Sequence, residues 1–198
     1  MRTIYTIGHS NHAPGDFLRL LALVQIEVLV DIRSRPNSAW AAFARRGNLS
    51  KLISSAGMRY VYMGDTLGGL PSDEDSYDTR TGKANYDIMR QKESFKEAIL
   101  KVLDVASRNS ICLVCAEESP AQCHRSLLVG KALSDLGACV LHLRADGRVQ
   151  TEEELLKERA GAPSDQAAFE DQVRDGMRSH IGKASATQDR EMPTWRRN

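Results

Sequence analysis

The sequence contains no apolar run long enough to cross a lipid bilayer, which takes roughly 20 consecutive apolar residues. The apolar stretch near the start, residues 3–7, is too short for a secretory signal and alternates as a strand does. Cysteine is scarce, with 4 in 198 residues, so nothing indicates a small secreted fold held by disulfides. We therefore expect a cytoplasmic protein without a membrane partner, whose cysteines are thiols.

A strong charge imbalance is also missing. The 27 basic and 26 acidic residues leave a formal net charge of +1. This balance excludes a global basic footprint for nucleic acid, although a local basic patch is compatible with it. The chain is 41% hydrophobic and 27% charged, as ordinary globular domains are. A core can therefore form without disulfides or a structural metal.

Hydrophobic patterning predicts strands that alternate with helices. The expected strands are residues 3–7, 27–32, 58–63, 110–115 and 138–143. The expected helices are residues 14–25, a short one ending at 55, 86–107 and 119–136, with a further helix start marked by the capping pair Thr151 and Glu154. This alternation is typical of a three-layer, Rossmann-like α/β domain, with a mostly parallel sheet and helices on both faces. We place this single domain at residues 1–160, followed by a helical or partly disordered extension at 161–198.

Titratable residues and glycines follow four of the expected strands. In strand order they are Gly8-His9-Ser10, then Asp31 with the run Arg33 to Pro36, then Asp65 with Gly68-Gly69, then Cys115 with Glu117-Glu118. The carboxyl ends of parallel strands meet at one edge of a sheet, and ligands bind there in α/β folds. We therefore expect a functional site at this edge.

The four cysteines have different expected roles. Cys112 and Cys115 form a Cys-x-x-Cys pattern, but residues three apart in a strand face opposite sides, so we expect Cys112, like Cys139, to be a core thiol. Cys123 is expected in the first turn of a helix that starts at Ser119, where helix amides and nearby Arg125 favour a thiolate. The alternative is that Cys123 only packs beneath its loop.

The first functional hypothesis is an enzyme. Cys123 or Cys115 would be the nucleophile, His124 or His9 the acid–base group, and Glu117 the residue that orients them. A weaker alternative is that Cys115, Cys123 and His124 bind a metal or tie the loop down, although their spacing matches no standard zinc signature. The sequence identifies no cofactor.

Arginines near the same edge suggest an anionic ligand, a phosphorylated or nucleotide-like molecule. The candidate ligand-binding residues are Ser10, Asp31, Arg33, Arg35, Gly68, Gly69 and Arg125. In the competing interpretation, Asp31 pairs with one of the arginines to brace the sheet edge, and the glycine pair only makes a turn.

A second functional hypothesis is a binding module without catalysis. Arg33, Arg35, Arg45 and Arg46, with Trp40 as a stacking ring, would then bind a nucleotide or nucleic acid, with an affinity that falls steeply with salt. The sequence leaves the oligomeric state open.

Four short motifs in order carry a family resemblance over roughly residues 3–145. They are Thr6-Ile7-Gly8-His9-Ser10, Asp31-Ile32-Arg33 with Pro36, Leu67-Gly68-Gly69, and Cys115-x-Glu117 followed by Cys123-His124-Arg125. Together they resemble the domain of unknown function 488 family. The resemblance implies a single α/β domain of prokaryotes without an assigned activity. This chain departs from the family pattern at residues 37–40 and at Leu70, where the family usually carries basic residues, which implies a weakened anion site or an altered substrate.

Overall fold

The computed structural model describes residues 2–10, 12–38 and 41–161. Met1–Arg159 form one compact unit. Apart from Gly161, the extension expected at 161–198 lies outside the described residues.

One sheet of six strands forms the middle layer. Its strands are β1 (Thr3–Gly8), β2 (Val28–Asp31), β3 (Arg59–Tyr62), β4 (Ile111–Cys115), β5 (Cys139–Leu143) and β6 (Val149–Thr151). The order across the sheet is β3-β2-β4-β1-β5-β6, and the strands pair in parallel except for β6, which runs antiparallel to β5. The predicted α/β class is therefore confirmed. Sequence patterning missed β6, because three residues are too few to show an alternation.

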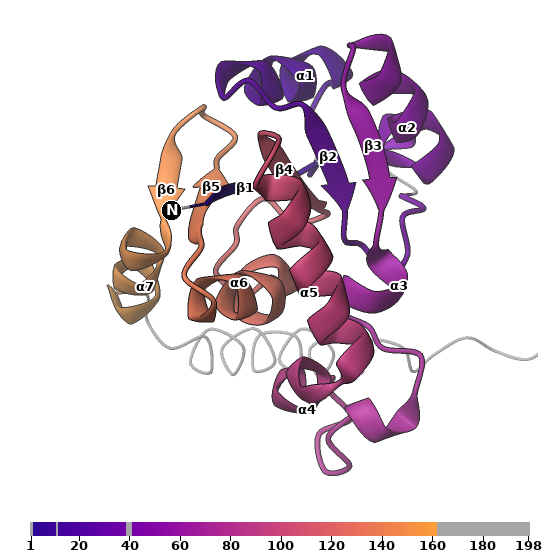
Figure 1. Ribbon diagram of the computed structural model, residues 1–198, viewed down its shortest axis with the longest axis vertical. Helices are drawn as coiled ribbons and strands as arrows, with labels where there is room; N and C mark the ends of the chain where they lie inside the picture. The colour runs from indigo at the N-terminus through magenta and orange to yellow at the C-terminus, as the bar shows by residue number, and fades with distance from the viewer. Residues whose placement is uncertain (1, 11, 39–40, 162–198) are drawn as a thin grey trace, which may run out of the picture. The chain divides into compact units, whose positions relative to one another are not determined.

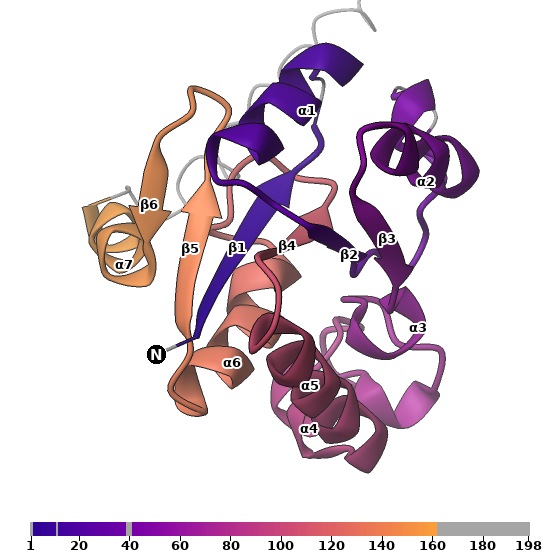
Figure 2. The same ribbon diagram turned by 45° about the horizontal axis from the view of Figure 1, so that its top comes forward.

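Helices cover both faces of the sheet (Figures 1 and 2). On one face lie α1 (Pro14–Leu23) and α2 (Arg46–Ser55). Phe17 and Leu21 of α1 and Ile53 of α2 pack with Leu29 and Val114 of the sheet.

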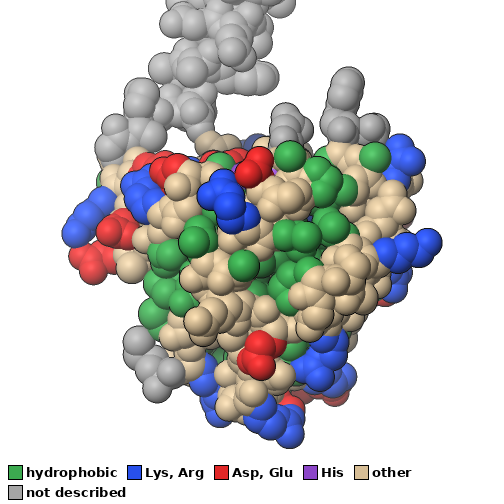
Figure 3. Space-filling view, turned by 90° about the horizontal axis from the view of Figure 1, so that it is seen from above, with side chains coloured by type: hydrophobic (Ala, Val, Ile, Leu, Met, Phe, Trp, Pro, Cys, Tyr) green, Lys and Arg blue, Asp and Glu red, His purple; other side chains and the backbone are tan. Residues whose placement is uncertain are grey.

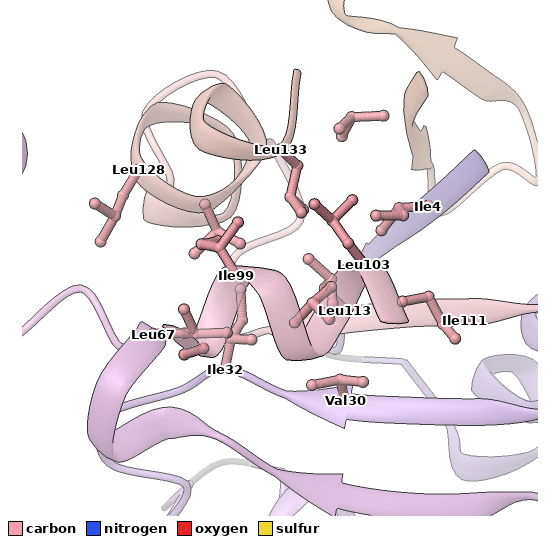
Figure 4. Packing of buried hydrophobic residues seen from close by; sticks show 14 of the residues in the cluster. Ile4, Val30, Ile32, Leu67, Ile99, Leu103, Ile111, Leu113, Leu128 and Leu133 are labelled. Atoms are coloured by element: carbon pink, nitrogen blue, oxygen red, sulfur yellow. The ribbon is translucent and has the colours of Figure 1, made fainter. Parts of the chain in front are cut away.

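On the other face lie α5 (Glu93–Ala106) and α6 (Lys131–Asp135). Ile99 of α5 and Leu133 of α6 pack over Val30 and Leu113 of the sheet (Figure 4). Each such side chain contributes about 1.5–3 kcal/mol on burial, so the amphipathic patterns of the helices fix this layering.

The helix expected at residues 86–107 is two helices, α4 (Tyr86–Gln91) and α5. Lys92 separates them with an extended backbone at φ −65° and ψ 136°. The side chain of Asn85 caps α4, and the ammonium of Lys92 forms an ion pair with Asp73. This distant ionic contact is not part of the helical pattern, so the pattern could not predict the break.

The helix expected from Ser119 begins later than predicted. The Ser119 hydroxyl accepts a hydrogen bond from the Ala121 amide at 3.3 Å, but residues 116–123 form bends and turns. Helical hydrogen bonding starts at the Cys123 carbonyl, which accepts from the Leu127 amide at 3.0 Å. A π-helix, η3 (Arg125–Gly130), follows and continues into α6. Cys123 therefore precedes the helix instead of lying in its first turn.

The remaining elements are short, except for the last helix. They are the 3₁₀ helices η1 (Ala42–Ala44) and η2 (Glu74–Ser76), α3 (Gly64–Leu67) and α7 (Glu152–Gly161). The capping box predicted at the start of α7 is confirmed: the Thr151 amide donates to Glu154 Oε2 at 2.8 Å, and the Glu154 amide donates to Thr151 Oγ1 at 3.2 Å. Among the described residues, no helix is long and apolar enough to span a membrane.

The side of the molecule that carries α1 and α2 exposes hydrophobic side chains across its middle, with lysines and arginines around them (Figure 3). A shallow hollow beside α1 is lined by Leu18, Arg19, Ala22, Ile26, Ala56 and Met58. Arg19 is the one charged side chain of this lining, so the hollow offers little chemistry.

The segments that follow β1 and β4 create a crevice at the carboxyl edge of the sheet. These two strands are neighbours, and Gly8 pairs in register with Cys115. The chain leaves β1 toward α1 on one face and leaves β4 toward α6 on the other. Such a divergence opens a binding crevice in parallel sheets.

Candidate functional site

A cavity of about 440 Å³ lies at this edge. Its lining comes from the segments after four strands and from the start of α4: His9, Arg33, Ser34, Arg35, Ser38, Gly69, Leu70, Tyr86, Cys115, Ala116, Glu117, Gln122 and His124. The candidates from sequence that share this lining are His9, Arg33, Arg35, Gly69, Cys115, Glu117 and His124. The other candidates, Ser10, Asp31, Gly68, Cys123 and Arg125, lie outside it.

Gly8 brings His9 next to Cys115. A Cβ atom at Gly8 would lie 1.7 Å from the Glu117 carbonyl oxygen, so only glycine lets β1 approach this loop. The His9 amide donates to the Cys115 carbonyl at 2.9 Å, and the Ser10 amide donates to that of Ala116 at 2.8 Å. The chain then turns away at Ser10, whose φ is 35°. Ser10 thus holds the loop and does not face the cavity.

His9 has the features of a neutral base. Its Nδ1 donates to the Ser10 carbonyl oxygen at 3.1 Å, which leaves the lone pair on Nε2. In the part of the chain that the structure describes, Nε2 has no hydrogen-bond partner. Burial lowers the pKa of His9 below its ordinary value of 6.5, against the opposing effect of the Ser10 carbonyl. The imidazole is therefore uncharged at neutral pH.

Cys115, Cys123 and His124 form a compact cluster, of which Cys115 and His124 line the cavity. The Cys123 thiol donates to Cys115 Sγ, with the two sulfurs 3.2 Å apart. His124 Nδ1 lies 3.5 Å from Cys115 Sγ, while its Nε2 donates to the Ile32 carbonyl at 2.9 Å and fixes the ring. Gly69 makes room for this ring, because a Cβ there would lie 2.7 Å from His124 Cβ.

These contacts separate the proton affinities of the two thiols. The hydrogen bond from Cys123 holds the pKa of Cys115 well below the usual 9.0; burial opposes this shift, and His124 reinforces it. The same bond raises the pKa of Cys123, with burial and Glu117 adding to the rise. Burial opposes a charge on His124, but the Cys115 thiolate outweighs it and raises the pKa of that imidazole. The arrangement favours a thiolate–imidazolium pair in which the thiolate is Cys115, whereas the sequence favoured Cys123.

The buried cation of Arg125 also favours a negative charge on the cysteine cluster. Its side chain is fully buried and donates through Nη2 to the Glu118 carbonyl, while its Nε and Nη1 have no partner among the described residues. Its charge interacts with Cys123 and Cys115. A cation in low dielectric stabilises a nearby thiolate. Arg125 is thus placed to stabilise the cluster electrostatically, beyond the reach of a ligand in the cavity.

Arg33 and Asp31 form a buried ion pair. Arg33 donates through Nε to Asp31 Oδ1 at 2.8 Å and through Nη2 to Oδ2 at 2.6 Å, and its Nη1 donates to the Ala44 carbonyl at 2.7 Å. The Tyr60 hydroxyl donates to Asp31 Oδ2 at 2.7 Å. This is the bracing arrangement that the sequence offered as the alternative to an anion site. Of the three candidate arginines, only Arg35 is exposed at the cavity.

The glycine pair makes room for neighbouring side chains, and Gly69 also lines the cavity. A Cβ at Gly68 would lie 2.2 Å from Ser34 Oγ, and Gly69 faces His124 as described above. Ser34 Oγ in turn accepts a hydrogen bond from the Leu70 amide at 2.9 Å, which ties the segment after β3 to the segment after β2.

Several lining residues were not identified from the sequence, namely Ser34, Ser38, Leu70, Tyr86, Ala116 and Gln122. Tyr86 is the most informative of them. Burial is the largest cause that raises its pKa, and the charges of Cys123, Glu117 and Cys115 add to the rise, so its phenol is held in the protonated form in the same cavity. Tyr86 begins α4, far from every motif in sequence, and its one local signal is the Asn85 cap that fixes the helix start.

The basic surface proposed for nucleic acid is smaller than the sequence suggests. Arg33 is buried, and the Arg46 guanidinium stacks 3.7 Å above the Tyr62 ring. Arg45 Nε donates to the Ser38 carbonyl at 3.1 Å, and Trp40 lies outside the described residues. Nucleic-acid binding stays a prediction.

The donor atoms of Cys115, Cys123 and His124 all lie within 4.8 Å of one another, a spacing that can also hold a metal ion. Two thiolates at about 2.3 Å from a tetrahedral zinc are separated by roughly 3.8 Å. The separation of 3.2 Å found here is shorter and suits a thiol–thiolate hydrogen bond. As they stand, the residues fit the hydrogen-bonded pair better than a metal site.

Residues 14–132 match a family model described as Domain of unknown function DUF488. The chain belongs to the DUF488 family. No curated protein and no solved structure matches the chain. The DUF488 match runs from α1 into α6 and includes Cys115, Cys123 and His124, whereas His9 precedes it. Since this family has no assigned activity, the function of this DUF488 protein has to be inferred from the geometry of its site.

Proposed function

We propose that the protein is a cysteine-dependent group-transfer enzyme acting on a small polar substrate. One observation carries the proposal: Cys115 Sγ lies 3.2 Å from the Cys123 thiol and 3.5 Å from His124 Nδ1, at the floor of a cavity of about 440 Å³. A thiolate that is formed before substrate binds is the usual source of nucleophilic power in cysteine enzymes.

The surrounding side chains supply the proton transfers. The Cys115 thiolate attacks an electrophilic carbon or phosphorus of the substrate, and the bond to the leaving group breaks. The His124 imidazolium transfers its Nδ1 proton to that leaving group. His9 Nε2 then accepts a proton from water, which attacks the thio-intermediate and releases Cys115 as the thiolate.

The charges of the lining limit the substrate. Arg35 offers a positive group, Arg33 is neutralised by Asp31, and Glu117 places a carboxyl group on the same wall. This combination favours a substrate with one anionic group over a multiply charged phosphate or nucleotide. We therefore propose a small monoanionic electrophile.

Alkylation of the cysteines by iodoacetamide tests the proposal. Cys115 should react at pH 6.5 about 100 times faster than an unperturbed cysteine in a peptide, which is then only about 1% thiolate. The Cys115→Ser variant should lose this fast reaction, whereas Cys112→Ser and Cys139→Ser should retain it. If Cys115 reacts no faster than the same residue in unfolded protein, the proposal fails.

A chromogenic thioester tests the assigned roles. Wild type should release the thiol and turn over, while His9→Gln should release it once and retain the acyl group on Cys115. His12→Gln is the matched control and should behave as wild type does. Equal turnover by the His9 and His12 variants would contradict the role of His9.

A further inference from the structure

Cys123 is a second thiol, in contact with the Cys115 sulfur that lines the cavity, and the group-transfer steps above do not consume it. Its side chain is 1% exposed, and its sulfur lies in direct contact with the Cys115 sulfur. Cys112 and Cys139 are in other places: Cys112 packs in the core beneath α1 and α2, and Cys139 begins β5. One thiol pair in this protein therefore has the contact needed for disulfide chemistry.

We propose that the protein also reduces small hydroperoxides, with Cys115 as the thiol that reacts with the peroxide and Cys123 as the thiol that resolves it to a disulfide. This proposal shares with the proposed function the use of Cys115 as nucleophile and of His124 as proton donor. It adds an oxidant, a hydroperoxide, and a dithiol that restores the reduced protein.

The position of Cys123 permits the change in geometry. A disulfide needs its sulfurs at about 2.05 Å, so the pair must close by roughly 1.2 Å from the present 3.2 Å. Cys115 is fixed at the end of β4, but Cys123 ends the turns of residues 116–123, just before η3. These turns can absorb such a shift without breaking a strand pair. Their start is anchored separately, since Arg144 donates to both carboxylate oxygens of Glu118, at 3.0 and 2.9 Å.

The first step oxidises Cys115. Its thiolate attacks the distal oxygen of the hydroperoxide, the O–O bond breaks, and the sulfur becomes a sulfenic acid. The alkoxide that leaves takes the Nδ1 proton of the His124 imidazolium and departs as the alcohol. The sulfur loses two electrons and the peroxide gains them.

The second step consumes Cys123. His124 Nδ1, now neutral and 3.9 Å from Cys123 Sγ, accepts the thiol proton. The Cys123 sulfur attacks the Cys115 sulfur, the S–O bond breaks, and the hydroxide takes the same proton from His124 to leave as water. The sum is one dithiol and one hydroperoxide converted to one disulfide, one alcohol and one water.

Arg125 favours return to the dithiol. Its Nε and Nη1 have no partner among the described residues, and its charge interacts with Cys123 and with the Cys115 thiolate. Oxidation removes that thiolate and leaves the cation less compensated. A disulfide whose reduced form is stabilised in this way is readily reduced by a small dithiol.

Hydrogen peroxide, used as the probe on the full chain, tests the proposal. After treatment with one equivalent, acid quenching and alkylation, peptide mass spectrometry should find a Cys115–Cys123 disulfide in wild type and in the controls Cys112→Ser and Cys139→Ser. Cys123→Ser should stop at the sulfenic acid and be trapped on Cys115 by dimedone. With dithiothreitol present, wild type should consume peroxide catalytically, whereas Cys123→Ser should turn over only as far as dithiothreitol itself reduces the sulfenic acid.

Three results would overturn the proposal. They are sulfenic or sulfinic acid on Cys115 of wild type without a disulfide, a disulfide that uses Cys139, or one zinc ion per chain that Cys123→Ser removes. In the first two cases, fast alkylation of Cys115 would leave the group-transfer proposal standing. If Cys115 reacts slowly with both iodoacetamide and peroxide, both proposals fail.

Discussion

Two charged pairs lie at the same edge of the sheet, and they differ in what their neighbours leave available. In the Asp31–Arg33 pair, Arg33 Nε, Nη1 and Nη2 all donate to protein acceptors, and Asp31 also accepts from Tyr60. In the Cys115–His124 pair, the thiolate borders a cavity and the proton on His124 can move. The first pair therefore serves stability and the second can serve chemistry.

The largest expected effect is on stability, at Asp31. Asp31→Asn should lower the free energy of unfolding by about 3–5 kcal/mol, because it leaves the buried Arg33 charge without its partner. Urea unfolding measures this loss. The surface pair Asp16–Arg19 is the control, and Asp16→Asn should change stability by less than about 0.5 kcal/mol. Similar losses of unfolding free energy in both variants would contradict the claim that the buried ion pair contributes more to stability than the exposed one.

The next effect concerns reactivity. Arg33→Lys should leave the alkylation rate of Cys115 at pH 6.5 within about twofold of wild type, although it lowers stability, because Arg33 is fully engaged by Asp31 and Ala44. Cys115→Ser should lower the total alkylation rate at the same pH about 100-fold. If Arg33→Lys instead lowers the alkylation rate as strongly as Cys115→Ser does, the Asp31–Arg33 pair also controls the reactivity of Cys115.

A variant of His124 can keep the hydrogen bond to the Ile32 carbonyl while it loses the imidazole. The amide of glutamine can replace Nε2 and keep the bond to the Ile32 carbonyl, but it has no group in the place of Nδ1. His124→Gln should therefore raise the pKa of Cys115, as read from the pH dependence of alkylation. His12→Gln should leave that profile in place. An unchanged profile in the His124 variant would mean that the imidazole does not stabilise the thiolate.

The smallest effect is expected at Glu118. Its hydrogen bonds from Arg144 lower its pKa, so its contribution to stability is complete above the ordinary value of 4.5 and is lost as the pH falls through the lowered value. Glu118→Gln should thus make stability less dependent on pH below about 5, by under about 1 kcal/mol since the pair is partly exposed. Glu117→Gln is the neighbouring control, and an equal effect there would contradict this assignment.

The strands, and the carboxyl edge of the sheet at which the site lies, could be predicted from the sequence, because both follow from local patterns. Val28–Asp31 and Ile111–Cys115 are short apolar runs, and parallel pairing then brings their ends together. Which polar groups are already paired could not be predicted. Arg33 follows one strand and Cys115 ends another, so the two look alike in sequence. They differ in their tertiary contacts: Ala44 and Tyr60 complete the hydrogen bonds of the Asp31–Arg33 pair, whereas His124 lies next to Cys115.

The identity of the thiolate shows the same limit. A helix-start pattern favoured Cys123, but the π-helix delays the helix, and the His124 ring points at Cys115. That ring is oriented by the Ile32 carbonyl, which is 92 residues away in the sequence. A pattern confined to residues 115–125 contains no information about this bond.

The ionisation of Cys115 is the central claim, and NMR can test it directly. The ¹³Cβ shift of cysteine-labelled protein, assigned with Cys115→Ser, reports thiol or thiolate as a function of pH. We predict a Cys115 signal that is already that of a thiolate at pH 7, while Cys112 and Cys123 remain thiols. A Cys115 signal that stays that of a thiol until the pH approaches about 8.5, the ordinary pKa of cysteine, would contradict the account.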